Sequence, residues 1–175
     1  APELEQWKYP LPGDSAIIMI NRVVIEVDNP KVIRFKMNAD ARRSTLCDDI
    51  ACNGSWSDTY WSKDGTQVAF VSVSRDHKKS NLRVANALNG DVRDVFEETV
   101  ATQYESGQGD VNWKFLPASN EFIWYSERNN FGHLYLYDLT TGHLKNQITN
   151  GSFTITRVID VDEEKRTILF EACGS

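Results

Sequence analysis

The chain has 175 residues, of which 41% are hydrophobic and 25% charged, the balance of a soluble globular protein rather than a disordered one. A formal net charge of -6 argues against a nucleic-acid binder that relies on a basic face. The longest apolar run, Ala16–Ile20, is far too short to span a membrane. Aromatic residues make up 11% of the chain, a content typical of proteins that pack sheets or line a binding surface.

Similar segments recur along the chain at intervals of about 50 residues. The matching segments are Asp58–Trp61 with Asp110–Trp113, Val68–Ser72 with Phe122–Ser126, Leu82–Ala85 with Leu134–Tyr137, and Gly90 with Gly142. The offset is 52 in every pair but the second, where it is 54. Partial copies flank the two full units. Ile155–Val161 and Thr167–Ala172 begin a third, and Val32–Met37 resembles the third strand of a preceding one.

Each unit is predicted to form four short strands. In the first unit these cover Thr59–Ser62, Gln67–Ser74, Leu82–Ala87 and Val92–Phe96. Glycine is expected to close the turns at Lys63-Asp64-Gly65, Asn89-Gly90 and Thr141-Gly142. Two segments, Asn81–Leu88 and Asp91–Tyr104, also tolerate a helix, but the repeat favours strands.

Four-stranded units of this length are typical of β-propeller blades. The chain is therefore predicted to be all-β, an incomplete β-propeller of about three to four antiparallel blades. We expect residues 1–54 to end one blade and connect onward, 55–103 and 104–152 to form blades, and 153–175 to begin the next. A closed ring normally needs 4–8 blades, so we expect the functional unit to extend beyond these termini.

Several motifs, taken in order, resemble one known family. They are Ser74-Arg75-Asp76-His77-Lys78, Phe96-Glu97-Glu98-Thr99, Gly109-Asp110-Val111-Asn112-Trp113, Ser126-Glu127-Arg128-Asn129, His133-Leu134-Tyr135-Leu136-Tyr137-Asp138 and Ile148-Thr149-Asn150-Gly151. Together with the opening Trp7–Gly13, they resemble the N-terminal propeller of dipeptidyl peptidase IV-type serine exopeptidases of the prolyl oligopeptidase family, bacterial members above all.

This resemblance implies a parent protein in which the propeller precedes an α/β-hydrolase domain that removes dipeptides from peptide substrates. The chain contains no Gly-x-Ser-x-Gly nucleophile elbow, so we expect it to be a non-catalytic part that gates and shapes substrate access. No cofactor, metal or nucleic acid is expected. The resemblance favours an exported, periplasmic protein, with a cytoplasmic one left open. An alternative is a free-standing interaction module that self-associates through open blade edges.

The resemblance also suggests site residues. Lys114 and Phe115 correspond to a channel-facing basic and aromatic pair near the substrate, although core packing is the stronger expectation for Phe115. Glu97-Glu98 resembles the glutamate pair that holds a substrate amino group, but its position favours an exposed strand end. His77, His133 and His143 are expected in turns or at the surface rather than as catalytic bases.

Three cysteines allow at most one disulfide within the chain. Cys47 and Cys52 flank four residues and could close a local disulfide or remain two free thiols. A metal site is disfavoured because no further thiolate or histidine ligands stand nearby. No basic segment followed by an apolar stretch opens the chain, so no signal peptide is expected.

Overall fold

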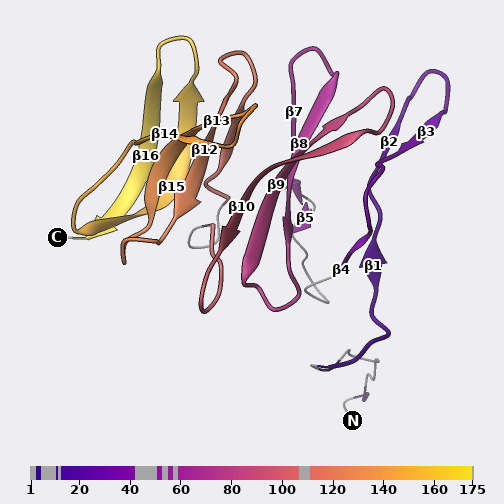
Figure 1. The fold of residues 1–175 in the computed structure, drawn as a ribbon, viewed down its shortest axis with the longest axis horizontal. Coiled ribbons are helices and arrows are strands. Elements are labelled where there is room, and N and C mark those ends of the chain that lie inside the picture. Colours follow the sequence, from indigo (N-terminus) through magenta and orange to yellow (C-terminus); the bar gives the residue numbers. More distant parts are fainter. Residues whose placement is uncertain are drawn as a thin grey trace.

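The structure is a computed structural model that describes residues 3–4, 11, 13–41, 51–52, 55–56, 59–106 and 111–174. All regular structure in these ranges is β-strand, which confirms the all-β prediction (Figure 1). No helix that could cross a bilayer occurs in the described ranges.

Two complete four-stranded antiparallel sheets form the middle of the molecule, with the strands in the order β10-β9-β8-β7 and β11-β12-β13-β14. Shorter pairs surround them, namely β1 with β4, β2 with β3, β5 with β6, and β15 with β16. The strands are β1 (Met19–Ile20), β2 (Val23–Ile25), β3 (Val32–Arg34), β4 (Asp40–Ala41), β5 (Ala51–Cys52), β6 (Ser55–Trp56), β7 (Thr59–Trp61), β8 (Gln67–Val73), β9 (Lys79–Asn86), β10 (Val92–Thr99), β11 (Lys114–Leu116), β12 (Glu121–Ser126), β13 (His133–Asp138), β14 (Leu144–Gln147), β15 (Phe153–Asp162) and β16 (Thr167–Gly174).

The four strands expected in the first sheet are confirmed, and both helical alternatives are excluded because their segments form β9 and β10. The turn between β7 and β8 depends on Gly65, whose φ is +70°. Asp64 stabilises this turn by accepting hydrogen bonds from the Ser62 hydroxyl at 2.6 Å and the Thr66 amide at 3.0 Å. Glycine provides the positive φ that the sequence pattern demanded.

The repeat register differs from the expected one in the first strand. Tyr60 pairs with Ala69, and Lys114 pairs with Ile123. Since Ala69 and Ile123 are themselves equivalent, Lys114 and not Asn112 is the counterpart of Tyr60, and the true offset here is 54. The match of Trp61 with Trp113 was wrong, because Trp61 is exposed while Trp113 is fully buried.

The offset of 52 holds only after the hairpin between the second and third strands. Ser72 pairs with Asn81, nine positions away, whereas the equivalent Ser126 pairs with His133, seven positions away. The second sheet therefore has the shorter hairpin, and this difference changes the repeat period within the blade.

The first described strands form a hairpin in which β1 pairs with β4 and β2 pairs with β3. The Gly90 turn abuts the Arg34 carbonyl of β3, just as the Gly142 turn abuts the Val95 carbonyl of β10. Since β10 is the fourth strand of its sheet, β3 occupies a fourth-strand position. The expectation that Val32–Met37 is a third strand was wrong, and β2 takes that place.

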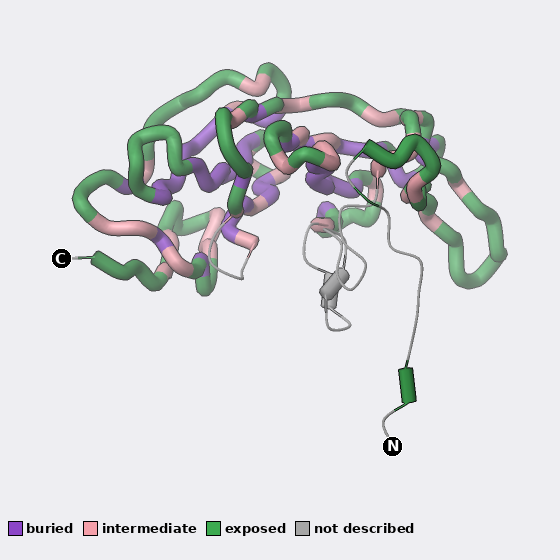
Figure 2. Tube along the Cα trace, turned by 90° about the horizontal axis from the view of Figure 1, so that it is seen from below, coloured by how far each residue is buried: buried purple, intermediate pink, exposed green. Residues whose placement is uncertain are grey.

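The core lies between the sheets rather than within one of them (Figure 2). One cluster joins the first sheet to the second through aromatic residues, including Trp113, Phe122 and Trp124. Another joins the second sheet to β15 and β16 through mainly aliphatic residues, including Ile123 and Ile155. The sheets therefore stack as successive blades without closing a ring, as the incomplete propeller predicts.

Candidate functional site

The first strands of three successive sheets contribute to one open groove of about 770 Å³. In a propeller such strands surround the central channel. The lining residues are Tyr60, Lys63, Lys114, Phe115, Leu116, Ala118, Ser119, Ile159, Asp160, Val161, Asp162, Glu163 and Glu164. Both cationic and anionic side chains therefore face the groove, with the carboxylates on the β15 side.

Strand register places three of these residues at the same position of their sheets. Tyr60 pairs with Ala69, Lys114 with Ile123, and Asp160 with Leu169, and these three partners occupy one equivalent position on the second strands. The groove wall therefore presents a phenol, an ammonium and a carboxylate in a row on adjacent first strands.

Lys114 lies half-buried at the centre of this row. Its Nζ donates hydrogen bonds to the Tyr60 hydroxyl at 3.1 Å and to the Val111 carbonyl at 3.3 Å. It also lies 5.5 Å from the centroid of the Tyr60 ring, which itself packs edge-on against Trp113 at 4.7 Å. These contacts hold the ammonium against the groove wall.

Phe115 is 8% exposed and belongs to the aromatic cluster between the first and second sheets. The expected core packing of Phe115 is confirmed, and its neighbour Trp113 is fully buried as well. Some Phe115 atoms line the groove, but most of the side chain is buried in the core. Substrate contact by Lys114 and Phe115 stays a prediction.

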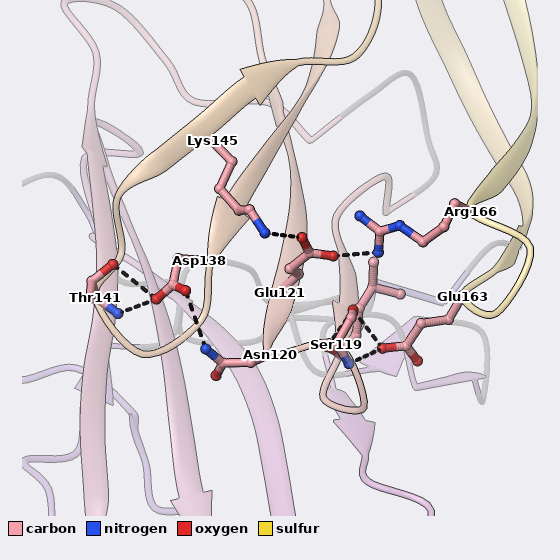
Figure 3. A network of polar contacts seen from close by, with 9 residues as sticks. Ser119, Asn120, Glu121, Asp138, Thr141, Lys145, Glu163 and Arg166 are labelled. Carbon is pink, nitrogen blue, oxygen red and sulfur yellow. Dashed lines mark hydrogen bonds and ion pairs between the residues drawn. The ribbon is translucent and has the colours of Figure 1, made fainter.

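Polar contacts between two turns form one end of the groove (Figure 3). Ser119 donates hydrogen bonds to Glu163 Oε1 from both its amide and its hydroxyl, each at 2.8 Å. Beside them, the buried Glu121 accepts from Lys145 of its own sheet and from Arg166 of the next hairpin. The turn that follows β11 is thereby fixed to the turn that follows β15.

Burial alone would raise the pKa of Glu121. The hydrogen bonds from Arg166 and Lys145 outweigh it, so the pKa of Glu121 lies below its ordinary value. This carboxylate therefore keeps its charge, and the contact between the two turns, throughout the neutral range.

The Glu97-Glu98 pair is split between two environments. Glu97 is exposed, as expected, but Glu98 is buried, so its assignment to an exposed strand end was wrong. Glu98 accepts hydrogen bonds from Trp124 Nε1 at 2.6 Å and from the Ser126 hydroxyl, and lies 3.5 Å from Arg128. It thus joins β10 to β12 of the next sheet.

The histidines also differ from one another. His133 is buried, which contradicts the expected turn or surface position; its ring nitrogens lie 3.2 Å from the Gly151 carbonyl and 3.3 Å from the Thr149 hydroxyl. His143 is exposed and His77 partly exposed, as expected. His133 therefore packs between β13 and the segment before β15, where its contacts are structural.

The possible disulfide between Cys47 and Cys52 falls outside the side chains that the structure describes. Cys47 lies outside the described residues, and of Cys52 only the backbone in β5 is described. The disulfide and the two free thiols therefore both stay predictions, while Cys173 is an exposed free thiol. Among the described residues, no group of three or more His, Cys, Asp or Glu side chains is placed to hold a metal ion.

Of the three residues in this row, only Lys114 was among the site residues predicted from the sequence; Tyr60 and Asp160 were not. The signal was present in the second strands, whose offset of 54 aligns Ala69 with Ile123 and so aligns their partners on the first strands. The identical residues Trp61 and Trp113 suggested an offset of 52 for the first strands instead.

Two solved structures are similar to this chain. One is a protein assigned as a dipeptidyl aminopeptidase IV from Bacteroides ovatus, with a TM-score of 0.55 and 18% identity over 90% of this chain. The other is dipeptidyl peptidase 4 from Porphyromonas gingivalis, with a TM-score of 0.53 and 16% identity over 90% of this chain. The chain spans only 27% and 24% of their respective lengths. These likenesses support the propeller fold. The model of the dipeptidyl peptidase IV (DPP IV) N-terminal region matches residues 1–175, and the chain therefore belongs to this family.

Proposed function

We propose that this chain forms part of the wall of a peptide passage in a dipeptidyl peptidase IV-like serine hydrolase, whose catalytic α/β-hydrolase domain is separate from it. Membership of the N-terminal region family supports the parent protein, and the sequence lacks the Gly-x-Ser-x-Gly elbow that such catalysis needs. The chain's role is then to shape and gate the approach of peptides.

One observation carries the proposal, namely the row of Tyr60, Lys114 and Asp160 on three adjacent first strands. A peptide offers carbonyl acceptors, amide donors and charged ends, and the row offers groups of each complementary kind along one groove. The groove is open rather than enclosed by a tight pocket, as expected for a passage that admits many sequences.

The gene that encodes the chain tests the parent protein directly. The reading frame should continue into an α/β-hydrolase domain that contains a Gly-x-Ser-x-Gly elbow. A stop codon directly after Ser175 would contradict the proposal. The isolated chain should not cleave a dipeptidyl-p-nitroanilide; cleavage abolished by a serine-directed inhibitor would equally contradict it.

The passage role needs a separate measurement in the full-length protein. Lys114→Met should raise KM for peptide substrates several-fold and leave kcat nearly unchanged, because it removes a contact on the approach path and not at the reacting bond. Lys36→Met is the matched control, since Lys36 forms an exposed ion pair with Asp91 far from the groove. Equal KM values for the two variants would show that Lys114 does not contact peptides in the passage.

A further inference from the structure

The chain contains three asparagines that are followed by glycine, of which Asn89 and Asn150 lie in the described part and Asn53 lies outside it. An Asn-Gly pair is chemically labile, because glycine has no side chain to keep its amide nitrogen away from the neighbouring carboxamide carbon. Asparagine is accordingly less frequent in proteins that must withstand heat. The local contacts of each pair decide whether the two groups can meet.

The turn between β9 and β10 holds the first pair in place. The Gly90 amide donates a hydrogen bond to the Asn86 carbonyl at 2.8 Å, so its nitrogen is engaged within the turn. Asn89 Oδ1 accepts from the Asp91 amide at 2.9 Å, which fixes the carboxamide. Attack of the Gly90 nitrogen on the Asn89 carboxamide would have to break both hydrogen bonds.

The second pair lies in the link between β14 and β15 and has no such restraint. Asn150 and Gly151 are both exposed. Within the described ranges, neither the Asn150 carboxamide nor the Gly151 amide forms a hydrogen bond. The restraints on Asn89 come from its own turn, so the contrast concerns local contacts and does not depend on what covers either segment. The reacting groups of the second pair are therefore able to approach each other.

We propose that Asn150 is a site of spontaneous deamidation in the folded protein. The Gly151 amide nitrogen gives up its proton to hydroxide and attacks Cγ of Asn150. The new N–Cγ bond forms, the Cγ–Nδ2 bond breaks, and the leaving nitrogen takes a proton from water and departs as ammonia. Water then opens the cyclic imide at either carbonyl carbon, which produces aspartate or isoaspartate with no change of oxidation state. The proposal does not depend on the peptidase assignment.

The neighbours of Asn150 are fixed to the second sheet, so a change in the main chain has a local consequence. Thr149 Oγ1 accepts from the Leu134 amide at 3.0 Å, and His133 Nε2 lies 3.2 Å from the Gly151 carbonyl. An isoaspartate passes the main chain through the former side-chain carbons and lengthens the link between these two contacts. We expect both contacts to weaken in the isoaspartate form, whereas aspartate leaves the length of the link unchanged.

Peptide mapping of the full-length protein, aged in mildly alkaline buffer, tests the site. Trypsin releases Asn150 within residues 146–157 and Asn89 within residues 84–93, and each peptide also holds an asparagine not followed by glycine, Asn146 or Asn86. Mass spectrometry should find Asn150 converted several-fold faster than Asn89, with Asn146 and Asn86 unchanged. In guanidinium chloride the two Asn-Gly pairs should react at similar rates, because the turn that protects Asn89 is lost. Equal rates in the folded protein, or an Asn150 that reacts only after denaturation, would overturn the proposal.

Two variants test the consequence for the second sheet. Asn150→Gln should stay unmodified, because the longer side chain would have to close a larger ring, and Asn150→Asp introduces the charge without lengthening the main chain. Hydrogen exchange at the Leu134 amide should accelerate on ageing in the wild-type protein and remain slow in aged Asn150→Gln and in fresh Asn150→Asp. Unchanged exchange in wild-type protein shown to contain isoaspartate would refute the weakening of the Thr149 contact.

Discussion

The sheet of β11–β14 meets its two neighbours through interfaces of different chemistry. Towards the first sheet it presents stacked aromatic rings; Phe122 and Tyr137 lie 5.0 Å apart at an interplanar angle of 12°. Towards β15 and β16 it presents aliphatic residues such as Ile123 and Leu134. Alternation along β12 sends successive side chains to opposite faces, so one six-residue strand specifies both interfaces.

The polar contacts that accompany these interfaces differ as well. At the aromatic interface a single buried carboxylate, Glu98, is held by Trp124, Ser126 and Arg128. At the aliphatic interface a buried side chain forms hydrogen bonds with the main chain of β15. Asn112 is fully buried; its Oδ1 accepts from the Val158 amide at 2.7 Å and its Nδ2 donates to the Thr156 carbonyl at 3.3 Å. A buried carboxylate therefore joins the first pair of sheets, whereas at the second a buried amide side chain hydrogen-bonds to the main chain, in addition to the Glu121–Arg166 and Ser119–Glu163 contacts of the turns.

Removal of an aromatic anchor should have the largest effect. Trp124→Ala deletes a fully buried ring and the hydrogen bond to Glu98, and should lower the free energy of unfolding by about 4 kcal/mol. Urea denaturation of the 175-residue chain at fixed concentration measures it. If Ile155→Ala in the aliphatic interface costs more, the aromatic interface is not the stronger one.

Neutralising the buried carboxylate should come next. Glu98→Gln leaves Arg128 without its ion-pair partner and should cost about 3 kcal/mol, while Glu97→Gln on the exposed side of the same strand should change stability by less than about 0.5 kcal/mol. Thermal unfolding of both variants compares neighbours in one strand. Equal shifts in Tm would show that burial of Glu98 contributes nothing.

The backbone contacts of the aliphatic interface are expected to contribute less. Asn112→Ala leaves the Val158 amide without its acceptor and should cost about 2 kcal/mol. Amide hydrogen exchange should accelerate at Val158 while amides in β10 remain protected. Uniform acceleration in both regions would mean that the two interfaces do not open independently.

The smallest effect should be a change in pH dependence. Since the folded pKa of Glu121 lies below its ordinary value, its contribution to stability is full above the unfolded pKa of about 4.3 and is lost as the pH falls through the folded pKa. Stability of the wild-type chain should therefore decrease more steeply on acidification than that of Glu121→Gln. Parallel curves between about pH 5 and pH 3 would contradict this account of the Arg166 and Lys145 contacts.

The sequence pattern was sufficient for the strands and turns of the two complete sheets, because apolar runs and glycine turns are local signals. It was insufficient for Glu98 and His133, since their burial depends on which neighbouring segment covers them. The error at Trp61 has a similar origin. Residue identity suggested a match with Trp113, but only hydrogen-bond register shows that their side chains occupy different positions. Asp160 was missed for the same reason.

The glycine turns limit where the blade can vary in length. A side chain at Gly90 or Gly142 would overlap a carbonyl oxygen of the preceding blade, so these turn tips bring the two main chains into contact. Blade spacing is set there by the backbone, and an insertion would push neighbouring blades apart. The hairpins between second and third strands already differ in length by two residues while both sheets keep the same pairing order. Evolutionary insertions should therefore accumulate at the hairpins that follow Ser72 and Ser126 and be rare at the glycine turns.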